Sequence, residues 1–224
     1  MSVRTSLWIA AGLAMAPAIA LGLARFAYAL LLPSMRADLA WSYTDAGAMN
    51  TANALGYLVG ELIASQVVTR CGAKRAFLAG LLLTAATLLA SGLTASFTWL
   101  IILRVIAGIA GAVAFVIGAA FTVAAMPRDK PASIPLAMGV YLGGGGLGIV
   151  ISALVVPPLL ALAGWRGGWI ILGAVSFLGA VLALPALRRV RAPTPRPKGD
   201  GQKGWSLRFL LPVVVSYGLF GAGY

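Results

Sequence analysis

The sequence predicts an all-α polytopic membrane protein with six transmembrane helices and the truncated start of a seventh. Hydrophobic residues make up 61% of the chain and charged residues only 10%, whereas an average soluble domain is about 25% charged. Apolar runs long enough to cross a hydrocarbon core, which takes about 20 helical residues, recur along the chain. Most charged residues lie in the short breaks between these runs.

The composition also excludes several other classes of protein. The chain has no His and a single Cys, Cys71, so a Cys/His metal site or a disulfide framework cannot be built, and we expect no metal and no cofactor. The net charge of +12 is spread over separate breaks, whereas a nucleic-acid footprint needs basic residues on one soluble face. This distribution predicts no nucleic-acid partner. No nucleophile–base pair, carboxylate pair or phosphate-cradling loop is evident, so we do not expect an enzyme.

The helices follow in order from the apolar runs and from the residues that end them. The breaks contain helix-ending residues such as Pro33, Gly72, Pro127 and Gly164. The predicted spans are residues 7–32, 44–68, 76–96, 98–126, 135–162 and 168–187, with a seventh beginning near Leu207. We therefore expect a six-helix unit over residues 1–187, a basic Pro/Gly linker over 188–206, and the start of a seventh helix over 207–224.

The distribution of Lys and Arg predicts the orientation, because positive residues in short loops stay on the cytoplasmic side. One side of the predicted topology has two, Arg36 and Arg166. The other side has thirteen: Arg4, Arg70, Lys74, Arg75, Arg128, Lys130 and the seven from Arg188 to Arg208. We expect a cytoplasmic N-terminus and linker in a cell inner membrane. The linker fits this topology, and it can also attract anionic lipid by about 1 kcal/mol per basic residue.

Three ionisable residues lie well inside predicted spans: Arg25, Glu61 and Arg104. A charge at that depth is costly and usually faces a bundle interior or a water-filled cavity. From the helical rise, Arg25 and Arg104 lie at comparable depth. The two guanidinium groups are expected to flank one cavity and to favour anionic or carboxylate-bearing solutes. Arg25 could instead extend toward the outer headgroups.

Other polar residues complete the candidate site. Glu61 is the candidate proton carrier, since an intramembrane carboxyl group can take up and release a proton; it could instead reach the cytoplasmic headgroups or pair with Arg70 or Lys74. Tyr28, Asn53 and Tyr57 are expected either to line the cavity or to hydrogen-bond neighbouring helices.

Glycines spaced four residues apart predict close helix packing in lipid. Three pairs that lie inside predicted spans have this spacing: Gly56 and Gly60, Gly139 and Gly143, and Gly144 and Gly148. The run of four glycines from Gly143 to Gly146 could instead loosen the fifth helix at a hinge or a cavity wall, because glycine is costly in a helix interior.

The break between the second and third helices resembles a motif of the major facilitator superfamily. The chain reads Ser-Gln-Val-Val-Thr-Arg-Cys-Gly-Ala-Lys-Arg over 65–75, where the superfamily carries Gly-x-x-x-Asp-Arg-x-Gly-x-Arg-Arg. Arg70, Gly72, Lys74 and Arg75 fit this pattern and would form the cytoplasmic gating loop. Thr69 replaces the acidic residue associated with charge-relay gating.

Further motifs resemble the YbfB/YjiJ-type branch of this superfamily. They are Arg-Phe-Ala-Tyr over 25–28, Asn53-x-x-Gly56-Tyr57-Leu58-x-Gly60, and Pro157-Pro158 ahead of Gly164-Trp165-Arg166-x-x-Trp169. Arg104 followed by Gly108 is similar to the fourth-helix pattern whose arginine is associated with proton coupling in the family.

The resemblance implies twelve helices in two halves, with a solute bound between them near the midplane. This chain would be the N-terminal half and the start of the seventh helix, a fragment of an ion-coupled secondary transporter that moves a small solute by alternating access. Its partners would be the solute, the bilayer, and a missing C-terminal half or a second copy. The alternative is a non-transporting membrane interaction or assembly protein that docks another bundle through its glycine faces.

Overall fold

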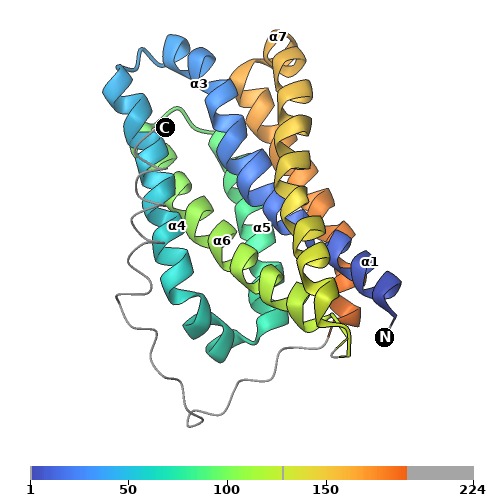
Figure 1. Cartoon of the computed structure of the whole chain (residues 1–224). Coiled ribbons are helices and arrows are strands. Elements are labelled where there is room, and N and C mark those ends of the chain that lie inside the picture. Colours follow the sequence, from blue (N-terminus) through green and yellow to red (C-terminus); the bar gives the residue numbers. More distant parts are fainter. Residues whose placement is uncertain (1, 128, 191–224) are drawn as a thin grey trace, which may run out of the picture. The chain divides into compact units, whose positions relative to one another are not determined.

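The computed structural model describes residues 2–127 and 129–190, and every element in these ranges is a helix. The bundle (Figure 1) consists of α1 (Val3–Leu13), α2 (Met15–Pro17), the π-helix η1 (Ala18–Phe26), α3 (Ala27–Asp38), α4 (Tyr43–Cys71), α5 (Ala73–Gly92), α6 (Phe97–Ala124), the short 3-10 helix η2 (Pro131–Ser133) and α7 (Ile134–Arg189). Arg128, most of the predicted linker and the predicted seventh helix lie outside the described residues.

The first four elements form one continuous helical stretch from Val3 to Asp38. The predicted end at Leu32 is therefore wrong, because Pro33 lies inside α3. Proline is tolerated inside membrane helices where neighbouring groups compensate for its missing N–H. The break comes later: Ser42 caps α4, its side chain accepting from the Asp45 N–H while the Asp45 carboxylate accepts from the Ser42 N–H.

Two glycines with positive φ separate the later helices, as their positions in the predicted breaks suggest. Gly72, with φ of 81°, ends α4, so α5 begins at Ala73 rather than at residue 76. Gly164, with φ of 63° and ψ of −173°, interrupts α7. Only glycine adopts such a conformation without strain. Figure 1 shows the chain reversing direction within α7, so residues before and after Gly164 form two antiparallel helices.

Four of the described helical stretches are long and apolar enough to cross a membrane: Val3–Asp38, Ala73–Gly92, Phe97–Ala124 and Pro131–Arg189. The last of these contains both helices of α7. The 29-residue α4 is not among the four, because residues such as Asn50, Asn53 and Glu61 lower its hydropathy. The count of six membrane crossings stays a prediction.

Glycine seams bring α4 and α6 into backbone contact, as predicted for Gly56 and Gly60. A Cβ atom added to Gly56 would meet the Val105 carbonyl oxygen, and one added to Gly60 would lie 2.5 Å from the Ile109 carbonyl oxygen. These glycines let the helices pack more closely than larger residues would.

The two predicted glycine pairs on α7 differ. Gly144 packs against the backbone of Ala14, and Gly148 packs against that of Ala18, so this seam is confirmed. Gly139 and Gly143 are exposed, with no atom within 4 Å of an added Cβ. The seam predicted for that pair is not formed among the described helices, because α7 turns its opposite face toward α2 and η1.

Side-chain contacts define two ends of the bundle. At one end the Ser6 hydroxyl donates to the Ala125 carbonyl over 2.7 Å, and Lys74 Nζ donates to the Arg188 carbonyl over 3.2 Å. At the other end the Trp165 indole N–H donates to the Asp38 carboxylate over 2.8 Å. The basic breaks that were predicted to lie on the same side of the membrane as the N-terminus thus share one end of the bundle (Figure 1).

Candidate functional site

The site is built on η1, the nine-residue π-helix that contains Arg25. In a π-helix each N–H bonds the carbonyl five residues earlier, and here the Ala27 N–H donates to the Gly22 carbonyl. Two side chains from other helices also donate to η1 carbonyls: Ser152 Oγ to Gly22 at 3.0 Å and Arg104 Nη1 to Ala24 at 3.0 Å. Such π segments occur frequently at functional sites.

Arg104 lies at the centre of the packing and is only 1% exposed. Its Nη2 donates to Ser91 Oγ on α5 over 3.3 Å, and its guanidinium lies 4.4 Å from the centroid of the Trp169 ring. Its backbone carbonyl accepts a 3.0 Å hydrogen bond from Asn53 Nδ2 on α4. Arg104 therefore joins η1, α4, α5 and α7 through hydrogen bonds and cation–π stacking.

The two arginines lie at similar depth, as the sequence predicts, but in different environments. Arg104 reaches the carbonyl of Ala24, the neighbour of Arg25. Arg25 itself is exposed on the surface of the described unit. The expectation that both guanidinium groups flank one open cavity is therefore not met in this structure, because Ala24, Ser91 and Trp169 hold Arg104 inside the bundle.

Two polar residues of α4, Tyr57 and Glu61, belong with Arg25 to the candidate site. Glu61 is exposed and Tyr57 is half-buried. Tyr57 and Glu61 are four residues apart, so the Tyr57 hydroxyl and the Glu61 carboxylate lie on the same face of α4. That hydroxyl oxygen is buried without a hydrogen-bond partner in the described part of the chain. A buried hydroxyl without a partner is unusual and leaves a donor available to a ligand or water.

Polar residues recur along one face of α4. Asn50, Tyr57, Glu61 and Ser65 are spaced by seven, four and four residues, which places them on one side of a helix. Asn50, Glu61 and Ser65 are exposed. A polar face of this kind suits contact with water better than contact with lipid tails.

Tyr28 and Asn53 hold helices together. The Tyr28 hydroxyl donates to the Ala46 carbonyl over 2.9 Å, linking α3 to α4. Asn53 binds the Arg104 carbonyl, while its Oδ1 has no partner among the described residues. Of the two roles considered from sequence, interhelical hydrogen bonding is the one that these contacts fit.

The predicted gating loop joins α4 to α5. Arg70, Gly72 and Arg75 are exposed, and Lys74 donates to the Arg188 carbonyl at the end of α7. Thr69, at the position of the superfamily's acidic residue, donates to the Gln66 carbonyl of its own helix over 2.8 Å. A gating role for this loop stays a prediction.

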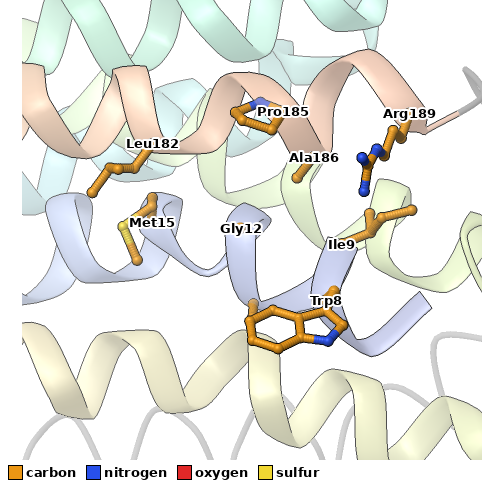
Figure 2. Close-up of a pocket in the computed structure, with 9 residues that line it drawn as sticks. Trp8, Ile9, Gly12, Met15, Leu182, Pro185, Ala186 and Arg189 are labelled. Carbon is orange, nitrogen blue, oxygen red and sulfur yellow. The ribbon is translucent and has the colours of Figure 1, made fainter. Parts of the chain in front are cut away.

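Three pockets lie elsewhere in the described unit. The first, ≈ 400 Å³, lies between α1 and the end of α7 (Figure 2). The second, ≈ 260 Å³, is lined by α4, α5 and α6, and the third, ≈ 250 Å³, adjoins Gly164. None of these three is lined by Arg25, Glu61 or Arg104.

Sequence reasoning missed the partners of Arg104. Ser91 follows Thr84 and Thr87 at helical spacing in an apolar run, and this spacing does not indicate which helix the three hydroxyl groups face. Trp169 offered a weak signal, since an indole inside an apolar span is a good stacking partner for an intramembrane arginine.

Comparison with known proteins gives a family and several relatives. The family described as "Uncharacterised MFS-type transporter YbfB" matches residues 5–224. The chain is 31% identical over 184 residues to the chloramphenicol resistance protein of Streptomyces lividans, covering 80% of this chain and 45% of that protein. It is 30% identical over 149 residues to probable anion transporter 3, chloroplastic, of Oryza sativa subsp. japonica, covering 66% of this chain and 28% of that protein.

A third relative is the uncharacterized MFS-type transporter YybF of Bacillus subtilis (strain 168). It is 31% identical over 136 residues, which are 61% of this chain and 33% of the relative. The chain thus spans less than half the length of these curated relatives.

Proposed function

Because the chain belongs to the family of YbfB-type transporters of the major facilitator superfamily, we propose that it forms part of a secondary transporter in which Arg25 binds the solute. The solute is small and carries a carboxylate or another anionic group. Transport occurs by alternating access and is driven by an ion gradient.

The exposure of Arg25 is the observation that supports this proposal most strongly. It is a full positive charge on the surface of an apolar helical stretch long enough to cross a membrane. Because a guanidinium among lipid tails is costly, Arg25 faces a water-filled path. Its fork of N–H donors matches a carboxylate in bidentate fashion. The Tyr57 hydroxyl, buried without a described partner, supplies a second contact to the solute.

Arg104 is a positioning residue in this proposal. It holds the Ala24 carbonyl and thereby fixes η1, the segment from which Arg25 projects. Asn53 and Tyr28 fix α4 against α6 and α3. Arg70, Gly72, Lys74 and Arg75 act as the gating loop at the basic end of the bundle.

Glu61 carries the coupling proton. It is exposed on the polar face of α4, one helical turn from Tyr57, so its protonation changes the charge beside the bound solute. Glu61→Gln is expected to keep solute binding while abolishing uptake driven by a pH gradient. Unchanged pH-driven uptake in this variant would contradict the assignment.

A second six-helix unit completes the path, either as a C-terminal half or as a second copy. The exposed α7 face that contains Gly139, Gly143 and Gly146 supports this, since added Cβ atoms there meet nothing within 4 Å. Small residues on an unpacked membrane helix suit close contact with another helix.

The test is uptake of carboxylate-bearing solutes into vesicles that contain the complete transporter. Arg25→Ala is expected to abolish uptake, and Arg25→Lys to weaken it, because lysine lacks the bidentate fork. Arg166→Ala, which removes an exposed arginine at the bundle end, is the matched control. Unchanged uptake by Arg25→Ala at equal membrane abundance would remove Arg25 from the site.

A further inference from the structure

A groove distant from Arg25 runs between α1 and the last turns of α7. Its volume is ≈ 400 Å³, within the range of roughly 300–1,000 Å³ typical of small-molecule sites. Figure 2 shows Ile9 and Gly12 of α1 and Met15 of α2 facing Leu182, Pro185 and Ala186 of α7. Apart from Gly12, which has no side chain, these residues give the groove apolar walls.

Gly12 forms the floor of the groove. A Cβ atom added to it would lie 2.5 Å from the Cβ atom of Ala186. The two helices therefore approach closely at this point, and the larger side chains on either side form the walls of a trough. The depth of the groove thus depends on two small residues in contact.

The polar groups of the groove lie near one end. Arg189, in the last turn of α7, extends toward α1 near Ile9 (Figure 2). Trp8, 69% exposed, lies at the rim. Tryptophan is enriched at the boundary between lipid tails and headgroups, because one edge of its ring is apolar and the other donates a hydrogen bond.

The charge of the chain is complementary to an anionic headgroup. The sequence has 17 Lys and Arg against five Asp and Glu, so most of its positive charge is not neutralised within the chain. Arg189, which lines the groove, is the last residue of α7, and Arg4 lies one helical turn before Trp8. A guanidinium binds phosphate oxygens in bidentate fashion.

We propose that this groove binds an anionic phospholipid. One acyl chain lies between α1 and α7 along Met15 and Leu182, and the phosphate binds Arg189. The site is separate from Arg25 and does not rest on the proposed transport function.

Native mass spectrometry of the full chain tests the proposal with two lipids of identical acyl chains, phosphatidylglycerol and phosphatidylcholine. Phosphatidylglycerol is expected to stay bound under conditions that remove phosphatidylcholine. Arg189→Gln is expected to weaken this binding about fivefold. Arg188→Gln is the matched control. It removes the same charge from the preceding residue, which does not line the groove.

A phosphatidylglycerol with a photoactivatable acyl chain locates the site. Crosslinks are expected at Met15 and Leu182, and Leu182→Trp, which fills the groove, is expected to reduce both binding and crosslinking. Three results would overturn the proposal: equal retention of the two lipids, equal effects of the two arginine variants, or crosslinks that avoid these residues.

Discussion

At the scale of single residues, Arg104 and Arg25 differ, although the sequence alone predicted that both would flank a solute cavity. Two nitrogens of the Arg104 guanidinium donate to a carbonyl and a hydroxyl, and the group lies over an indole ring, the three partners coming from three other elements. Its buried Nε has no hydrogen-bond partner among the described residues. Arg25, one residue beyond the bonded Ala24, remains exposed. The buried guanidinium links the helices packed around it, and the exposed one is the solute-binding group of our proposal.

Replacing Arg104 by Lys is expected to destabilise the bundle by about 1–2 kcal/mol, because one ammonium cannot bond Ala24 and Ser91 while stacking on Trp169. Thermal unfolding in detergent, followed by tryptophan fluorescence, measures the loss. Arg166→Lys is the control, since Arg166 also lies over a tryptophan, Trp165, but on the surface. Equal shifts in the two variants would argue against a structural role specific to Arg104.

The sequence predicted the depth of both arginines because depth follows from helical rise. It could not predict their separate environments, because these depend on which face of α6 meets α5 and α7. The partner ring of Arg104 lies at Trp169, far away in the chain. The π-helix could not be predicted either, because the register of backbone hydrogen bonds does not follow from the amino-acid composition.

At the scale of elements, helix contacts depend on where glycines allow backbones to meet. α7 illustrates this, because Gly144 and Gly148 face α2 and η1 while Gly139 and Gly143 face outward. The spacing of four predicted both pairs equally. Spacing identifies a helical face, but it does not say which neighbour covers that face.

Gly148→Ala is expected to destabilise the unit by about 1–3 kcal/mol, because its Cβ would enter the backbone of Ala18. Gly139→Ala should leave stability unchanged or slightly raised, since its Cβ meets nothing within 4 Å and alanine favours helices. Denaturation of the two variants in the same detergent compares them directly. Similar losses for both would contradict the seam described for α7.

At the scale of the whole molecule, the thirteen-to-two distribution of Lys and Arg predicts a cytoplasmic N-terminus. The structure places the N-terminal end of α1, the α4–α5 loop and the end of α7 at one end of the bundle, as this topology requires. The alternation of helices and breaks was predictable from hydropathy. The continuation of α3 past Pro33 was not, and only the structure shows it.

The single cysteine offers a direct test of orientation without any mutation. Cys71 is exposed at the end of α4, next to Gly72. A membrane-impermeant maleimide is expected to label it in inside-out vesicles and to leave it unlabelled in intact cells. Labelling in intact cells, with a known cytoplasmic cysteine protein as control, would reverse the predicted orientation.

The central claim is that Arg25 faces a water-filled path inside the membrane rather than lipid. Arg25→Cys and Leu178→Cys, each made in the complete transporter with Cys71→Ser, test it, because thiols react with charged methanethiosulfonates only in water. Leu178 is 58% exposed on the apolar α7. We expect rapid modification at position 25, slowed by a bound solute, and none at 178. Equal, negligible reaction at both positions would contradict the account.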